Sequence, residues 1–132
     1  MYKPFRDWVE ANWKGGSAAF ELKLVKKGAM PFKSVAPHQR EGLLKAASGL
    51  YHKLFDMPHF AGSSFRFDAK KPFDSFFLQG AGYVVPIWYF PRERKTAYVI
   101  PVESFLQMEV AGTRKSMTEE MARANATLTI NL

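Results

Sequence analysis

The sequence predicts one mixed α/β (α+β) domain in which a single sheet is flanked by helices. The chain has 132 residues, of which 47% are hydrophobic, so it is long enough to bury one core. Apolar residues recur at helical spacing in some segments and alternate or run continuously in others. In chain order these segments read as a helix, a strand, a helix, four strands, a helix and a C-terminal segment.

The first expected element is a helix over residues 4–13. Pro4 lies near its start, where the missing N–H costs no helical hydrogen bond. The sequence KGGS at residues 14–17 ends it. Its apolar side chains recur at helical spacing: Phe5, Trp8, Val9 and Trp13.

Residues 18–26 alternate as a strand, so successive side chains point to opposite faces. One face takes Phe20, Leu22 and Leu24, and the other takes Glu21, Lys23 and Val25. The sequence KKGAMPFKS at residues 26–34 is expected to form a basic loop.

A second helix is expected from Ser34 or Pro37 to Ser48. Ser34 is a suitable cap and Gly49 a suitable stop. Gln39 lies four residues before an apolar stripe and therefore on or beside the packed face. The stripe consists of Leu43, Leu44, Ala46, Ala47 and Leu50.

The central part of the chain predicts several strands joined by Gly-rich and charged turns. Pro86 inside one of them predicts an edge position or a bulge. The expected strands are residues 50–55, 73–78, 82–90 and 96–100, with turns at 79–82 and 91–95.

Two helices and a strand are expected after these strands. Residues 101–108 read as a short helix opened by Pro101, and residues 112–124 as a polar helix. The second helix is expected to begin at Ser116, with Glu119 completing a capping box. Residues 126–132 read as a last strand. We therefore expect a domain at 1–110 and a C-terminal tail at 111–132, packed on the domain or on a partner.

Charge and composition favour an anionic partner inside the cell. The formal net charge is +7, and residues 1–53 hold ten Lys and Arg side chains against four Asp and Glu. Nucleic acid or a membrane surface would suit this charge, and an unspecialised basic surface is the alternative. The chain has no cysteine, no apolar run of about 18 residues and no signal-peptide core, which favours a cytoplasmic protein without a membrane partner.

Glu21 and Lys23 stand out because side chains at i and i+2 of a strand point the same way. A buried carboxylate is costly unless it is paired or binds a metal ion. The simplest interpretation is an exposed ion pair. Asp74 lies in a second apolar strand, where Asp is disfavoured unless it follows Pro72 as a turn residue. Two carboxylates from two strands are the hard oxygen ligands that Mg²⁺ requires.

The sequence FELKLVKKGAMPFKSVAPHQREGLLKA at residues 20–46 resembles the core of the RecU-type and archaeal-type Holliday-junction resolvases. These belong to the PD-(D/E)xK, or restriction-endonuclease-like, superfamily. The similar pattern is a strand ending in Glu-x-Lys, a Lys-rich loop and a His-Gln pair opening a helix. Residues 81–90 and 95–106 resemble the strands and helix that follow, so the resemblance covers roughly residues 18–106.

This resemblance implies a restriction-endonuclease-like mixed central sheet flanked by helices, and a Mg²⁺-dependent (or Mn²⁺-dependent) DNA endonuclease in DNA recombination. The implied substrate is branched DNA, above all a four-way junction, and the implied sources are phages or archaea. The implied catalytic residues are Glu21, Lys23, Asp74 and Gln39. The implied metal ligands are Asp74, Glu21, the Leu22 carbonyl and, as an accessory, Glu10. The implied phosphate contacts are Lys26, Lys27, Lys33 and Arg40.

One feature departs from the family, which places its metal-binding Asp on a strand before the Glu-x-Lys strand. Residues 1–17 read as a helix plus KGGS, so we expect Asp74 to supply this carboxylate in a permuted strand order. A second Asp-x-Lys, Asp68 and Lys70, is not followed by a basic loop and a Gln-bearing helix, and we prefer Glu21 and Lys23.

Two other functions remain open. The chain would be a non-catalytic nucleic-acid-binding module if the metal site is incomplete, or a basic protein–protein adaptor if the charged pair is structural. A resolvase makes two symmetric cuts, so a homodimer is expected. The apolar strands at 73–78 and 82–90 are its expected interface, unless residues from 111 onward fold back over them.

Overall fold

A computed structural model describes residues 2–48 and 80–132, together with the backbone of residues 51–52 and 76–77. Asp68, Lys70 and Asp74 lie outside the described residues. The elements in chain order are α1 (Lys3–Asn12), β1 (Ala18–Val25), β2 (Met30–Pro31), η1 (Phe32–Ser34), α2 (Pro37–Ser48), β3 (Tyr51–His52), β4 (Phe76–Phe77), β5 (Ala81–Phe90), β6 (Arg94–Pro101), α3 (Val102–Ala111), β7 (Ser116–Met117), α4 (Glu119–Asn125) and β8 (Leu128–Asn131).

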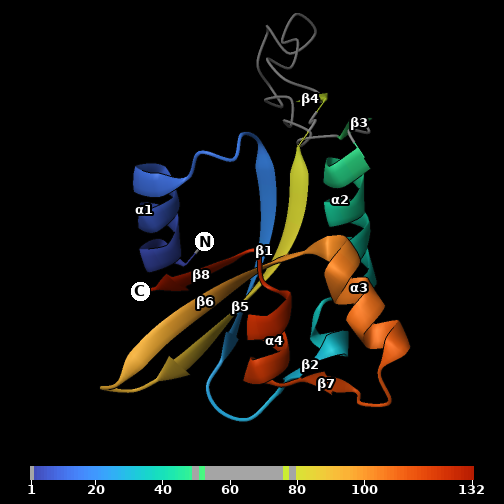
Figure 1. The fold of residues 1–132 in the computed structure, drawn as a ribbon. Helices are drawn as coiled ribbons and strands as arrows, with labels where there is room; N and C mark the ends of the chain where they lie inside the picture. The colour runs from blue at the N-terminus through green and yellow to red at the C-terminus, as the bar shows by residue number, and fades with distance from the viewer. Residues whose placement is uncertain (1, 49–50, 53–75, 78–79) are drawn as a thin grey trace, which may run out of the picture.

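The fold is mixed α+β, with a mixed sheet flanked by helices. The main sheet has the order β1-β5-β6-β8, in which β1 is parallel to β5 and the other neighbours are antiparallel. Helix α1 covers one face, and α2, α3 and α4 lie on the other (Figure 1). Two short ribbons, β2 with β7 and β3 with β4, complete the described strand pairing. The expected coarse fold class is therefore confirmed.

The face under α1 is filled by one apolar cluster. Phe5 of α1 is fully buried against β-branched side chains of the sheet, and Phe20 and Leu22 of β1 pack at its margin. The buried sheet members are Val85, Ile87, Ala97, Val99 and Ile130. The helix predicted at 4–13 thus packs on the face of strand 18–26 that was predicted to hold Phe20 and Leu22.

The opposite face holds the larger cluster, which packs under α2, α3 and α4. Its sheet members include Val84, Trp88, Tyr98 and Ile100, and Phe105 of α3 is fully buried among them.

Gly82 allows α2 to approach the sheet closely. A Cβ at this position would lie 2.3 Å from the Leu43 carbonyl oxygen of α2, closer than real Cβ contacts come. Ala19 of β1, the register partner of Gly82, is also small. The helix that follows the basic loop is thereby fixed over β1 and β5.

Pro86 corrects one sequence prediction, because it lies in a central strand. β5 pairs with β1 on one side and with β6 on the other, and Pro86 is in register with Lys23. The β5–β6 ladder skips Val85 and Pro86 and then resumes in the same register, so no residue is inserted. Proline cannot donate to the ladder, and the ladder to β6 leaves Pro86 out without inserting a residue.

The C-terminal residues are built into the domain. β8 pairs with β6, and Ile130 is buried on the α1 face. Met117 and Ala122 are fully buried on the other face. Helix α4 begins later than expected, because Ser116 is in β7 and the Thr118 hydroxyl accepts a hydrogen bond from the Met121 N–H.

The strand that was expected to form a dimer interface is buried inside the domain, between β1 and β6 and under α2 and α3. Val84, Val85, Ile87 and Trp88 of β5 are at most 1% exposed within the single chain. The apolar side chains of residues 82–90 therefore supply no free surface, which corrects the interface prediction for this strand. The side chains of residues 73–78 lie outside the description.

Candidate functional site

Glu21 and Lys23 meet on the α2 face of β1, at an edge of the main sheet. Lys23 Nζ lies 3.2 Å from Glu21 Oε1, and the two side chains are 23% and 25% exposed. The predicted alternation placed them there, since Phe20 and Leu22 occupy the α1 face. The pair is therefore partly sheltered from water and still reachable from solvent.

An open hollow runs along the edge of β1 beside this pair. It has a volume of about 430 Å³ and is lined by Tyr2 and residues 20–24; we call it the β1 groove. A second hollow of about 240 Å³ continues from it around the end of the strand and is lined by residues 23–27, 29–31 and 34; we call it the lysine hollow. Lys23 and Leu24 line both, so the charged pair opens toward the basic loop.

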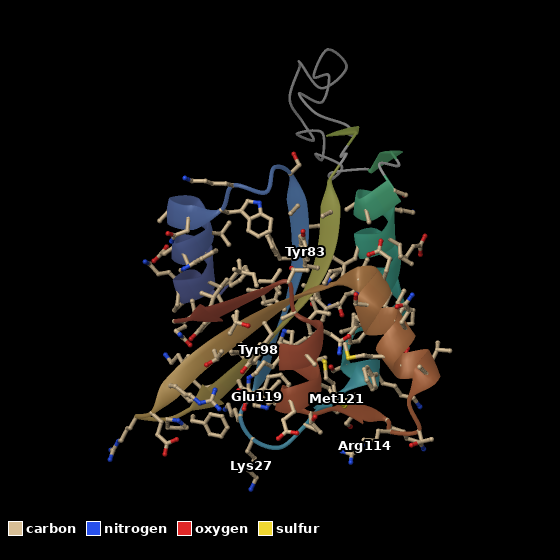
Figure 2. The ribbon with its side chains drawn as sticks, viewed as in Figure 1. Lys27, Tyr83, Tyr98, Arg114, Glu119 and Met121 are labelled. Carbon is tan, nitrogen blue, oxygen red and sulfur yellow. The ribbon has the colours of Figure 1, made fainter. Side chains whose placement is uncertain are left out.

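The basic loop is held to the sheet by Trp88. The buried indole Nε1 donates a hydrogen bond to the Gly28 carbonyl oxygen at 3.0 Å. Gly28 has φ of +77°, a conformation that side-chain-bearing residues rarely adopt. This anchor leaves Lys27 pointing away from the domain at the tip of the loop (Figure 2). Lys26 and Lys27 both line the lysine hollow.

Arg40 lies in a structural network. Its guanidinium donates to the backbone carbonyls of Val35 and Phe32, at 2.8 and 2.6 Å, and forms two hydrogen bonds with the Glu109 carboxylate of α3. It also lies 5.4 Å from the centre of the Phe105 ring. The hydrogen bonds from Arg40 lower the pKa of Glu109. Arg40 therefore ties η1, α2 and α3 together, and these contacts occupy the group expected to bind phosphate.

The Gln39 side chain is engaged at the start of α2, which is the alternative to a catalytic role. Its Oε1 accepts a hydrogen bond from the Ala36 N–H at 2.8 Å. This is the back-reaching half of a capping box at the start of α2. Lys33 is exposed on η1 and lines a different hollow, of about 460 Å³, together with Arg40 and Glu109.

Glu10 is separated from Glu21 by the sheet. It lies on α1, which covers the opposite face, its side chain is 71% exposed, and it is 3.9 Å from Arg6. Leu22 lies between Glu21 and Lys23 on β1, with its side chain toward α1. Within residues 2–48 and 80–132 no three Asp, Glu or His side chains are grouped so as to hold a metal ion. Asp74, the expected second carboxylate of the metal site, lies outside the described residues.

A second polar cluster, which the sequence did not reveal, joins α4 to β6. Glu119 accepts two hydrogen bonds from Arg94, at 2.7 and 2.8 Å, and one from the Tyr98 hydroxyl at 2.6 Å (Figure 2). The hydrogen bonds from Arg94 lower the pKa of Glu119, and burial raises the pKa of Tyr98. Arg123 also contacts the Tyr98 hydroxyl, at 3.3 Å. The sequence identifies Glu119 only as a helix-start residue, because nothing near it in the sequence indicates its contacts with Arg94 and Tyr98.

Comparisons with protein-family models, with curated proteins and with solved structures find no match to this chain. No helix within the described part of the chain is long and apolar enough to cross a membrane. The case for a function therefore depends on the residues and their geometry.

Proposed function

We propose that this chain is a Mg²⁺-dependent endonuclease of the restriction-endonuclease-like fold that cuts branched DNA, as a Holliday-junction resolvase does. The observation that carries the proposal is the Glu21–Lys23 pair. It lies partly buried on an edge strand, and it opens into a groove that continues past two further lysines. This is the arrangement that the Glu-x-Lys pattern and its basic loop imply.

The donor set around Glu21 fits a hard divalent cation in part. Carboxylate oxygens such as those of Glu21 are the ligands that Mg²⁺ or Mn²⁺ takes in proteins, whereas Lys23 Nζ, 3.2 Å from Oε1, supplies no ligand. Glu21 and, in our proposal, Asp74 and the Leu22 carbonyl would hold the ion. Bound there, it would acidify a water molecule and neutralise charge on the phosphate.

Lys23 has the second chemical role in the proposed site. Its ammonium group lies beside the carboxylate and can orient the attacking water and stabilise the negative charge that develops on the phosphate. Glu21 keeps the ammonium in place, because their separation of 3.2 Å is an ion-pair distance. The two residues would thus act as one unit.

Substrate affinity in this proposal comes from the lysine hollow. Lys23, Lys26 and Lys27 line it, and phosphate neutralisation by lysines supplies most of the sequence-independent affinity for DNA. Arg40 is left out of this set because its guanidinium binds Glu109 and two carbonyls. A resolvase would pair two such subunits, through a surface other than the buried side chains of β5.

The second candidate is a non-catalytic nucleic-acid-binding module. One observation favours it: among the described residues the carboxylate of Glu21 is not joined by two further Asp, Glu or His side chains. This module would use the same lysines and bind the same DNA without cutting it.

Cleavage of a labelled four-way junction, a flap and a blunt duplex tests the proposal. The protein is incubated with each DNA in Mg²⁺, in Ca²⁺ and in EDTA, and products are separated on a denaturing gel. We expect junction cleavage in Mg²⁺ and binding alone in Ca²⁺. Tight binding with no product in Mg²⁺ or Mn²⁺ would instead establish the binding module. Failure to bind any of the three DNAs would reject both candidates.

A further inference from the structure

A small pocket lies where β1 and β5 end, on the face of the sheet that α1 covers. It has a volume of about 250 Å³ and is lined by Tyr2, Leu24, Lys26, Tyr89 and Lys95. We call it the tyrosine pocket. It shares Tyr2 and Leu24 with the β1 groove, and Leu24 and Lys26 with the lysine hollow. A ligand held at Glu21 and Lys23 can therefore extend into this pocket without leaving the protein surface.

The pocket combines aromatic rings with cations. Two tyrosines and two lysines line it, and among the described residues no acidic side chain does. Leu24 is 54% exposed, which is unusual for a leucine in a strand and shows that the pocket has an apolar wall open to solvent. An acidic or zwitterionic ligand with a flat apolar part would satisfy both the rings and the cations.

An unpaired nucleotide has these properties. Its base offers two flat faces that stack on tyrosine, and its phosphate pairs with lysine. Bases inside a duplex are stacked on each other and cannot enter a pocket of this kind, whereas the branch point of a junction or a flap can expose one.

We propose that the tyrosine pocket binds one unpaired nucleobase of the DNA substrate, with Lys26 and Lys95 contacting its neighbouring phosphates. This rests on the proposed function, since it requires that DNA bind at the adjoining groove. The pocket would make the protein select branched or single-stranded DNA over a blunt duplex.

Tyr89 and Lys95 show how the pocket would accept a base. They are opposite each other in the β5–β6 ladder, and Lys95 Nζ lies 4.9 Å from the centre of the Tyr89 ring. Both residues are part-exposed, and a cation–π contact that is open to water is weak. An entering base can therefore replace the ammonium group over the ring, and Lys95 can turn to the phosphate.

Binding without a divalent metal tests this inference separately from cleavage. The affinities of a labelled oligothymidylate and of a blunt hairpin duplex are measured by fluorescence anisotropy in EDTA. Tyr89→Leu should lower the affinity for oligothymidylate about tenfold and leave the duplex affinity nearly unchanged. Tyr89→Phe keeps the ring and should bind like the wild type. Lys95→Ala should also weaken oligothymidylate binding, and Lys115→Ala, an exposed lysine outside the pocket, should not.

Photocrosslinking gives a second readout that does not depend on a folded variant. Oligothymidylate carrying iododeoxyuridine is irradiated with the wild-type protein, and the adduct is located by mass spectrometry. We expect it on Tyr2 or Tyr89. Adducts only outside the pocket, or a Tyr89→Leu effect equal for both DNAs, would overturn the inference. Metal-dependent cleavage of the junction by a protein with either result would leave the proposed function standing.

Discussion

Lys23 Nζ lies 3.2 Å from Glu21 Oε1, on the α2 face of an edge strand whose other face packs against α1. The two residues are neighbours because i and i+2 positions of a strand share a face. They are also the only charged positions of β1, whose remaining residues are all apolar. This pair gives the proposed site its carboxylate and its cation at once.

Lys23→Met should separate catalysis from binding. The change keeps the length of the side chain and removes its charge, so the developing charge on the phosphate loses a stabilising partner. We expect junction cleavage to slow by about a hundredfold in single-turnover assays. The junction affinity should change far less, since Lys26 and Lys27 remain. Lys45→Met, which removes a lysine paired with Glu41 on α2, is the matched control and should cut normally. A wild-type rate for Lys23→Met would exclude the proposed role.

Lys26→Ala combined with Lys27→Ala should weaken binding to junction, flap and duplex alike. Both lysines line the hollow at the end of β1, and each phosphate contact that is lost removes about one unit from the slope of log affinity against log salt. Titrations at several salt concentrations measure this slope. An unchanged slope would show that the loop lysines remain solvated when DNA is bound.

Arg40→Ala should destabilise the fold. The guanidinium loses the Glu109 carboxylate and two backbone carbonyls, and its side chain is only 20% exposed. We expect a loss of about 2 kcal/mol or more in the free energy of unfolding, measured by urea denaturation. Junction affinity at a temperature where the variant is folded should stay within about twofold of the wild type. A large drop in affinity without loss of stability would restore Arg40 as a phosphate contact.

Stability should fall as the solution becomes acidic, in part through Glu109 and Glu119. Hydrogen bonds from Arg40 and Arg94 lower the pKa of these carboxyls in the folded protein. Below the unfolded value of about 4.3 the unfolded chain binds more protons than the folded one, so protonation favours unfolding. Their contribution is thus complete at neutral pH and is lost as the pH falls through the lowered folded values.

Urea denaturation at neutral pH and at about pH 2.5, well below the unfolded value, checks this dependence. The double variant Glu109→Gln and Glu119→Gln should be less stable than the wild type at neutral pH, and the difference should shrink in acid. Glu103→Gln, on α3, is the control and should keep the wild-type dependence. An undiminished difference in acid would show that the charges of these two carboxylates do not contribute.

The periodicity of apolar residues predicted most of the helices and strands, but it could not predict which distant strands pair with each other. The alternation of residues 18–26 assigned both faces of β1, because side-chain direction in a strand is a local property. The position of Pro86 was wrong because the strand neighbours of β5 are decided by β1, some sixty residues earlier, and by β6. The sequence around a proline does not show whether its strand lies at the edge or in the centre of the sheet.

In the candidate site, too, contacts between sequence neighbours were predictable and contacts between distant residues were not. Glu21 and Lys23 were predicted as a pair and lie as one, since they are two positions apart on one strand. The roles of Arg40 and Gln39 depend on what they contact, and Glu109 is sixty-nine positions from Arg40. The tyrosine pocket brings together Tyr2, the end of β1 and the paired ends of β5 and β6, so it exists only in the folded chain.

The most direct measurement of the central claim is junction cleavage by Glu21→Gln in Mg²⁺, beside Glu41→Gln. Both changes turn a lysine-paired glutamate into an amide, and Glu41 lies 66% exposed on α2, where it pairs with Lys45. We predict that Glu21→Gln binds the junction with wild-type affinity and leaves it uncut, while Glu41→Gln cuts at the wild-type rate. Cleavage by Glu21→Gln at the wild-type rate would contradict the proposal that this carboxylate holds the catalytic metal ion.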